Sequence, residues 1–314
     1  MHVRLWGVRG SYPTPMTPGM FHDKCRALLA EAQPEDLASP EAIDALLARS
    51  PHGRSFGGNT SCVEVSFGRT MCILDAGSGI AGLSSHIMKE GLFRDRQIKL
   101  FFTHFHWDHV CGFPFFAPIY VPGQEIEVYS GRPDAERLLS MQMNDAHFPV
   151  KWGTLPSRIR CHQLTVDEPH DFAAEGRVRV LRLEHPDGAW GYRIEHDAHA
   201  VCYLTDTEIS KNPDQWAETY AAFIAGADVV IVDAAYGFLD FHEHINWGHS
   251  TIFTWIDFLR ETDIGELVIF HHDPLADDVA LAKLLESAER YRELVAPEST
   301  WRLSAAFEGQ TWDL

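Results

Sequence analysis

The chain has 314 residues and a formal net charge of −19, which makes long-range attraction to nucleic-acid phosphates or anionic lipid unfavourable. Hydrophobic residues make up 45% of it and aromatic residues 11%, which excludes a disordered chain and allows a large core. The 18 histidines exceed what packing needs, and histidine is the commonest metal ligand.

The sequence shows no sign of a secretory or membrane segment. Residues 1–10 lack an apolar signal core, and the most apolar run, 225–235, is short and interrupted by Asp228 and Asp233. The six cysteines include no CxxC pair, and three of them lie in strand-like runs. We therefore expect a reduced, cytoplasmic protein with no membrane partner.

The predicted elements alternate between strands and helices in both halves of the chain. A first strand is expected at 2–8, and the proline-rich segment 13–56 is interpreted as a helical insertion within a single domain, 1–314. Strands grouped with helices in each half predict two β-sheets packed together with helices outside. The further predicted elements are strands 62–67 and 70–76, helix 80–90, strand 98–103, a helix starting near 109, strand 126–130, helix 134–144, strands 177–184, 190–195 and 200–205, helix 213–225, strand 228–234, helix 250–262 capped by Ser250, strand 266–270, helix 277–294 and strand 301–307.

The densest histidine cluster directly follows the apolar strand predicted at 98–103. It comprises His104, His106, Asp108 and His109. A strand end that leads into a loop can turn alternate side chains toward one point, and imidazoles and carboxylates are ligands for zinc and similar metals. A histidine run on a plain surface would not follow a buried strand, so this pattern predicts a metal site.

The pattern HxHxDH after a strand resembles the signature of the metallo-β-lactamase superfamily. Four further segments resemble motifs of that family in the same order: ILDAGSG at 73–79, EHPDGAWGYRIE at 184–195, YLTDTE at 203–208 and VIFHHDP at 268–274. The resemblance spans about 57–308 and leaves the 13–56 segment uncovered. It implies an α/β fold, a four-layer αβ/βα sandwich in which two mixed β-sheets have helices outside.

Carried onto this sequence, the resemblance implies two divalent metal ions, with zinc favoured and manganese as the alternative. One ion would be held by His104, His106 and His185, and the other by Asp108, His109 and His271, with Asp206 bridging the two. A metal-bound hydroxide between the ions would be the nucleophile at neutral pH. His272 competes with its neighbour as the last ligand, but His271 directly follows the predicted strand. Asp75 is expected to orient a ligand histidine.

A second group of residues, outside the predicted ligands, suggests a proton donor. Phosphodiesterase branches of the superfamily, including tRNA 3′-processing endonucleases and small cyclic-phosphate phosphodiesterases, carry a non-ligand histidine between the bridging aspartate and the last ligand. His249 has that position, and Asp233 is expected to orient it. With Asp108, these two residues form the predicted catalytic set. The alternative for His249 is an ordinary core or surface role.

The expected function is that of a dinuclear metal-dependent phosphodiesterase acting on a small anionic substrate, including cyclic phosphodiesters. The acidic charge and the lack of a glycine-rich basic arm disfavour long nucleic acid. Three alternatives stay open: hydrolysis of a lactone, thioester or β-lactam at the same metals, tRNA 3′ processing, and a non-catalytic metal-binding sensor. A homodimer also stays open.

Other side chains near the motifs are candidates for substrate contacts. Arg9, Arg54 and Lys151 could contact phosphate, although a solvated surface role is favoured for each. Five aromatic residues could line a pocket, with core packing at least as well supported for each. They are Phe113, Phe115, Phe116, Trp152 and Trp190.

Overall fold

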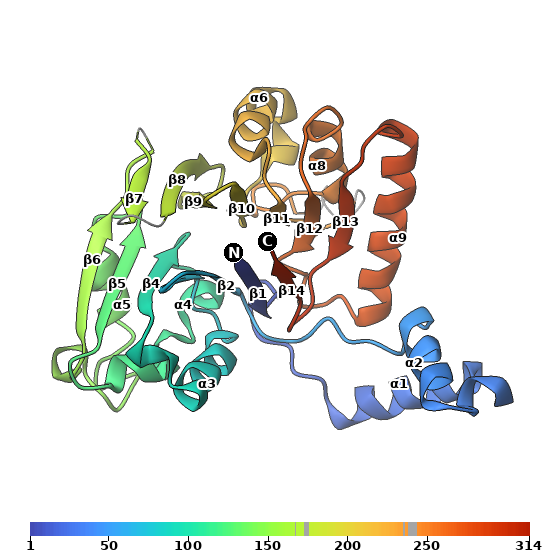
Figure 1. Cartoon of the computed structure of the whole chain (residues 1–314), viewed down its shortest axis with the longest axis horizontal. Helices are drawn as coiled ribbons and strands as arrows, with labels where there is room; N and C mark the ends of the chain where they lie inside the picture. Colours follow the sequence, from blue (N-terminus) through green and yellow to red (C-terminus); the bar gives the residue numbers. More distant parts are fainter. Residues whose placement is uncertain (167, 173–175, 235, 238–243) are drawn as a thin grey trace.

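The computed structural model describes all residues except 167, 173–175, 235 and 238–243, and these described residues form two seven-stranded β-sheets that face each other (Figure 1). The first sheet has the order β14-β1-β2-β3-β4-β5-β6, and the second has the order β13-β12-β11-β10-β9-β8-β7. The strands of the first sheet are β1 (His2–Gly7), β2 (Cys62–Phe67), β3 (Thr70–Leu74), β4 (Gln97–Phe102), β5 (Glu125–Ser130), β6 (Arg158–Gln163) and β14 (Thr311–Asp313). The strands of the second sheet are β7 (His170–Phe172), β8 (Gly176–Leu183), β9 (Ala189–His196), β10 (His199–Leu204), β11 (Val229–Asp233), β12 (Glu266–Phe270) and β13 (Arg302–Ala305).

Both sheets are mixed in the same way. Strands β3 to β6 are parallel to one another, as are β10 to β13, and the remaining pairings are antiparallel. Parallel strands place their carboxyl ends at one edge of the sheet, which is where ligands bind in open α/β sheets. The predicted site residues follow β4, β10 and β12, so the topology brings them to such edges.

Alternation of side chains along the strands produces three hydrophobic layers. One face of each sheet contributes to a core between the sheets, as Phe101 and Phe270 do. The opposite faces pack against helices: Leu100 lies in the cluster of the first sheet, and Ile269 lies in that of the second. Core strands such as β11 and β12 are buried along their full length, as expected for strands covered on both faces. The predicted four-layer αβ/βα sandwich is therefore confirmed.

Helices cover the outer faces of the sheets. The first sheet carries α3 (Ile80–Glu90), α4 (Trp107–Val110) and α5 (Ala135–Ser140), and the second carries α6 (Pro213–Ile224), α8 (Ile252–Phe258) and α9 (Asp278–Val295). Short 3₁₀ helices occur at Pro34–Leu37, Leu92–Arg94, Phe113–Phe115, Ala117–Tyr120, Trp152–Thr154 and Ile209–Lys211. None of the helices in the described part of the chain has both the length and the apolar character that a membrane crossing requires.

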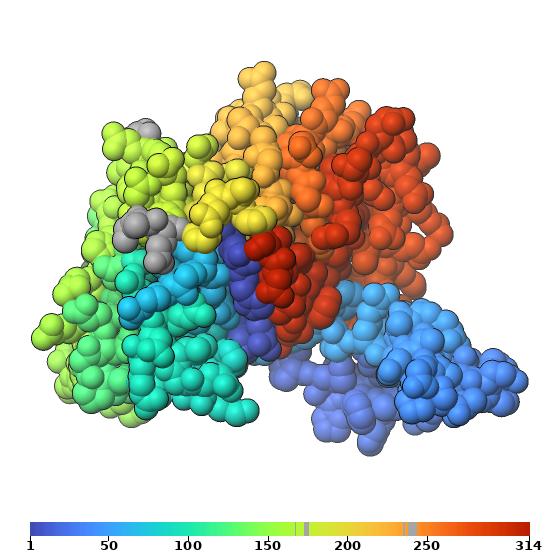
Figure 2. Space-filling view, in the orientation of Figure 1, coloured from blue at the N-terminus to red at the C-terminus, as the bar shows by residue number. Residues whose placement is uncertain are grey.

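The predicted insertion is helical and stands out from the body (Figure 2). It contains α1 (Pro18–Glu31) and α2 (Pro40–Arg49), which lie beside α9 in Figure 1. Ser39 caps α2 by accepting a hydrogen bond from the backbone N–H of Ala42, and proline occupies the first helical position. Helix α1 buries none of its residues. Lys24 forms an ion pair with Asp278 that ties the insertion to α9.

Several element predictions were wrong in detail. Strands β6, β7 and β14 were not predicted, because edge strands carry exposed polar side chains; four of the six residues of β6 are polar or charged. The helix expected near 109 is the single turn α4, and the helix expected at 250–262 ends at Phe258. Its cap is Thr251, which accepts a hydrogen bond from the backbone N–H of Thr254, rather than the predicted Ser250.

Candidate metal centre

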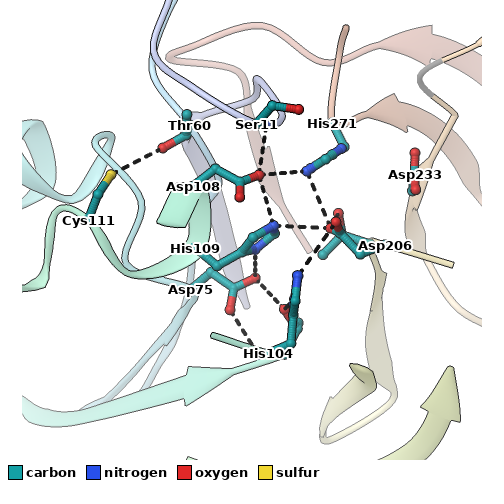
Figure 3. A network of polar contacts seen from close by, with 12 residues as sticks. Ser11, Thr60, Asp75, His104, Asp108, His109, Cys111, Asp206, Asp233 and His271 are labelled. Atoms are coloured by element: carbon teal, nitrogen blue, oxygen red, sulfur yellow. Dashed lines mark hydrogen bonds and ion pairs between the residues drawn. The ribbon is translucent and has the colours of Figure 1, made fainter. Parts of the chain in front are cut away.

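Three residues at the ends of core strands adopt left-handed backbone conformations. They are Asp75 (φ 60°) after β3, Asp206 (φ 56°) after β10 and His271 (φ 58°) after β12. This conformation is uncommon for residues other than glycine and costs on the order of 1–3 kcal/mol each. All three side chains belong to one buried polar cluster, so the strained backbone coincides with the candidate site (Figure 3).

One group of predicted ligands consists of three histidines. His104 and His106 lie in the loop after β4, and His185 lies in the loop before β9. Their potential ligand atoms lie within 4.8 Å of one another. The ring centroid of His104 is 4.5 Å from that of His106 and 4.7 Å from that of His185. The structure thus brings the first predicted ligand set together, from both sheets.

The second group is fully buried. His271 Nε2 lies 3.0 Å from Asp108 Oδ2, and His109 Nε2 lies 3.1 Å from Asp206 Oδ2. Asp206 Oδ1 lies 3.7 Å from His104 Nε2, so this carboxylate contacts both groups, as the predicted bridging role requires (Figure 3). The potential ligand atoms of the group again lie within 4.8 Å of one another. Its members are Asp108, His109, Asp206 and His271.

The donor atoms of these residues fit divalent cations. The buried ring nitrogens His104 Nε2 and His185 Nδ1 have no hydrogen-bond partner among the described residues, and His109 Nε2 faces the carboxylates of Asp108 and Asp206. A buried polar atom left without a partner costs about 1–3 kcal/mol, and metal coordination removes that cost. Burial lowers the pKa of His185 to about 4, and burial together with neighbouring histidines holds the pKa of His104 well below its usual range. Both rings are therefore neutral at pH 7, which is the state that binds metal.

The two aspartates in the second group are ionised. Burial acts to raise the pKa of Asp206, but the imidazoles of His271 and His109 outweigh it and hold that pKa well below its usual range. The same balance of burial against His109 and His271 lowers the pKa of Asp108. A set of five imidazoles and two carboxylates is suited to zinc or manganese.

Asp75 contacts one of the candidate ligand histidines, as the sequence analysis expected. It is fully buried, and its Oδ2 atom lies 2.8 Å from His109 Nδ1 and accepts the Tyr203 hydroxyl at 3.0 Å. The backbone N–H and the hydroxyl of Thr103 also donate to this carboxylate, each at 2.8 Å. The contact to Nδ1 leaves His109 Nε2 to face the ligand group. Tyr203 belongs to the second sheet, so Asp75 also links the two sheets.

The predicted proton donor lies beside the second group. His249 Nδ1 is 2.8 Å from Asp233 Oδ2, and Asp233 is fully buried at the end of β11. The His249 ring stacks on the His271 ring, with centroids 5.0 Å apart. Burial lowers the pKa of His249, but Asp233 outweighs it and raises that pKa to about 9. The ring is therefore charged at pH 7, and Nε2 remains available to donate a proton.

His272, the alternative last ligand, and the basic side chains considered as phosphate contacts bind other groups of the protein. His272 Nε2 lies 2.7 Å from the carbonyl of Ala306, and His271 rather than His272 lies in a group of side chains that could hold a metal ion. Arg9 is buried, and its guanidinium donates to the carbonyls of Gly57, Asp273 and Ala276. Lys151 forms an exposed ion pair with Asp145.

Of the five aromatic residues considered in the sequence, three are buried and Phe115 is 61% exposed. Phe113 and Phe116 are fully buried core residues, and Trp190 is buried beneath Arg182. Two tryptophans that the sequence analysis missed, Trp107 and Trp247, are instead 65% and 60% exposed beside the ligand segments. Trp107 lies inside the HxHxDH signature, and Trp247 lies two residues before His249. Their closeness in sequence to these motifs could have identified them as candidates for substrate contacts.

One backbone contact to the site was also unpredicted. The N–H of Ser11 donates to Asp108 Oδ2 at 2.8 Å (Figure 3). Gly10, the preceding residue, lies so close to His271 that a Cβ atom there would fall 2.3 Å from its ring. The residues just before the insertion segment therefore pack directly against two candidate ligands.

Comparisons with known proteins point to one family. Residues 71–272 match the model of the Beta-lactamase superfamily domain. Ribonuclease Z from Lacticaseibacillus casei (strain BL23) is 31% identical over 170 residues, which cover 51% of this chain and 48% of that protein. The match therefore spans about half the length of this curated relative.

Two solved structures share the fold. Zn(2+)-bound PqqB from Methylobacterium extorquens superposes with a TM-score of 0.66 and 18% identity, covering 100% of both chains. A diphosphatase from the PhnP family superposes with a TM-score of 0.61 and 15% identity, covering 100% of this chain and 97% of that one. Identities this low describe the fold alone.

Proposed function

We propose that this chain, which belongs to the β-lactamase superfamily, is a metal-dependent hydrolase that cleaves small anionic phosphodiesters. The family and the His/Asp cluster support metal-dependent hydrolysis. The observation that carries the phosphodiesterase assignment is the pair formed by His249 and Asp233, whose side chains lie 2.8 Å apart beside the candidate ligands.

The predicted ligands would hold two divalent ions, for which we propose zinc, with manganese as the alternative. His104, His106 and His185 would hold one ion, Asp108, His109 and His271 would hold the other, and Asp206 would contact both. When bound, the ions would activate water at neutral pH and balance negative charge on phosphoryl oxygens.

The proton donor favours phosphodiesters over carbon-centred esters. Cleavage of a phosphodiester expels an alkoxide, which is a poor leaving group, and a positioned proton donor accelerates such a step by roughly 10²–10⁴-fold. Asp233 orients the His249 ring through Nδ1 and keeps it charged, so Nε2 can donate to the leaving oxygen. Cleavage of a β-lactam, lactone or thioester at the same ions has less need of this residue.

The charge distribution favours a small substrate. The chain carries a net charge of −19, and the 13–56 segment has more acidic than basic residues, so both the body and the insertion would repel a long polyanion at long range. Processing of tRNA 3′ ends is the second candidate, because the curated relative is a ribonuclease Z.

The test compares two phosphodiesters that differ in their leaving groups, with zinc or manganese present. Wild type should hydrolyse both bis(p-nitrophenyl) phosphate and a 2′,3′-cyclic nucleotide. His249→Ala should lose roughly 10²–10⁴-fold on the cyclic nucleotide and little on the p-nitrophenyl ester, whose leaving group needs no proton. No turnover of any phosphodiester would refute the proposal.

The competing functions give different results. Hydrolysis of a lactone, thioester or β-lactam that survives His249→Ala would favour the carbon-centred alternative. Cleavage of a 3′-extended tRNA precursor would favour the endonuclease. Stoichiometric zinc without turnover on any of these panels would support a metal-binding sensor.

A further inference from the structure

Glu208 is a buried carboxylate whose hydrogen bonds go to a single loop. It lies two residues after Asp206 and is 4% exposed. One of its oxygens accepts the backbone N–H of Asn246 at 2.6 Å, and the other accepts that of Gly248 at 3.1 Å. No cation pairs with it among the described residues. An unpaired carboxylate is costly to bury, so these two backbone contacts offset much of that cost.

The loop at 246–248, to which Glu208 is hydrogen-bonded, has an unfavourable backbone conformation. Asn246 has φ 70° and Gly248 has φ 90°, both in the left-handed region. A Cβ atom at Gly248 would lie 2.3 Å from the ring of His185, so only glycine allows the loop to pass this candidate ligand. His249 is the next residue, so its backbone begins where the loop passes the His185 ring.

Further contacts tie the same segments together. The Ser250 hydroxyl donates to the carbonyl of Thr207 and accepts the backbone N–H of Ile209 at 3.0 Å. The backbone N–H of Glu208 donates to the carbonyl of Glu184 at 2.7 Å, one residue before His185. The loop with the proton donor is therefore bonded on both sides of His249 to the segment that carries Asp206, and that segment is bonded to the one that carries His185.

We propose that Glu208 is a positioning residue that fixes His249 relative to the candidate ligands Asp206 and His185. It has no part in bond breaking; it acts by holding the backbone at 246 and 248, which sets where the His249 ring stands. This inference rests on the proposed role of His249 as proton donor, and its structural part can be tested without any substrate.

The first experiment measures the loop itself. Glu208→Gln keeps the size of the side chain but replaces one acceptor oxygen with an NH₂ group, which cannot accept from a backbone N–H. Hydrogen exchange followed by mass spectrometry should show the 244–250 segment exchanging about 10-fold faster or more, because a hydrogen bond to a charged group is lost. Unchanged exchange in this segment would overturn the inference.

A matched control removes a similar carboxylate elsewhere. Glu64 is 5% exposed on β2 and accepts two neutral hydrogen bonds, from Trp6 Nε1 at 3.0 Å and from the Ser66 hydroxyl at 2.7 Å. Glu64→Gln should leave exchange at 244–250 as in wild type. Equal acceleration in both variants would mean that a general loss of stability had been measured, and it would count against a specific role for Glu208.

The second experiment asks whether Glu208 acts through His249. In Glu208→Gln, kcat on the 2′,3′-cyclic nucleotide should fall about 10-fold, while turnover of bis(p-nitrophenyl) phosphate and zinc content stay as in wild type. In a His249→Ala background the same substitution should have no further effect. Equal loss on both substrates, or a loss that adds to that of His249→Ala, would overturn the inference.

The two hypotheses can fail separately. If exchange at 244–250 accelerates in Glu208→Gln but wild type hydrolyses no phosphodiester, Glu208 holds the loop and the proposed function is wrong. If wild type hydrolyses both phosphodiesters but Glu208→Gln changes neither exchange nor leaving-group dependence, the proposed function stands and the positioning role is wrong.

Discussion

Removing the charge of Asp233 should convert His249 from a charged ring to a neutral one at neutral pH. The rise of the His249 pKa from 6.5 to about 9 is a preference for the charged ring of about 3 kcal/mol. Its source is the Asp233 carboxylate, 2.8 Å from Nδ1, acting against burial. In Asp233→Asn only the weaker effects of Asp206 and Asp108 oppose burial, so the pKa should fall to about 6.5.

The consequence for catalysis follows from the protonated fraction. A donor with a folded-state pKa near 9 is competent below that pH and fails as the pH rises through it. With pKa values of about 9 and 6.5, roughly nine-tenths of wild-type rings and about 3% of variant rings are charged at pH 8, so kcat on the cyclic nucleotide should fall on the order of 30-fold. The alkaline limb of the pH–rate profile should move to lower pH by about two units or more.

A matched carboxylate–histidine pair provides the control. Asp228 Oδ1 lies 3.2 Å from His199 Nδ1, and Asp228 immediately precedes β11, the strand that Asp233 ends. Asp228→Asn should leave the pH–rate profile unchanged. Bound ions act on wild type and Asp233→Asn alike, so the difference between them isolates the carboxylate. An alkaline limb at the same pH in both proteins would refute the reasoning.

Three other substitutions or treatments test the site. Chelation should lower Tm and zinc should restore it, because an ion present at 1,000 times its Kd stabilises the fold by about 4 kcal/mol; an unchanged Tm would contradict ion binding. Asp75→Asn should weaken zinc affinity about 10- to 100-fold in a competition assay, since the amide cannot accept from all the donors that surround this carboxylate; wild-type affinity would show that His109 needs no such partner. Trp247→Ala should leave Tm unchanged, because the side chain is 60% exposed, and should raise KM about two- to tenfold for a substrate with a planar leaving group; an unaltered KM would remove Trp247 from the site.

Part of the site could be predicted from local sequence, because its members share one strand and loop. His104, His106, Asp108 and His109 follow β4 within a few residues, so their convergence needs no tertiary information. The distant ligand His271 carries no such signal by itself, and it was assigned from the resemblance of its segment to a family motif. The two groups found in the structure match that assignment, and metal ligation itself stays a prediction.

Contacts made by tertiary packing were not predictable in this way. The N–H of Ser11 meets Asp108, and the Glu208 carboxylate meets Gly248, across 97 and 40 residues. No pattern of residue types encodes either contact, because each depends on how two loops approach. Aromatic side chains posed a similar problem: Phe113 and Trp107 are close in sequence, but one is buried and the other exposed.

The fold was predictable where strands are covered on both faces and not where they lie at an edge. Strands β11 and β12 are continuous apolar runs, whereas β6 alternates between half-buried and exposed positions. The single domain over 1–314, the cytoplasmic location and the homodimer stay predictions.

The candidate ligands come from both sheets, which pack against each other through a shared hydrophobic core. His104 follows a strand of the first sheet and His185 precedes one of the second, so either half alone would offer an incomplete coordination shell. Ion affinity therefore reports how well the two halves are docked. A small gap opened in the core between the sheets, at Phe101 or Phe270 for example, should register as weaker zinc retention although no ligand has been altered. Zinc content could therefore be used to measure how well the core between the two sheets is packed.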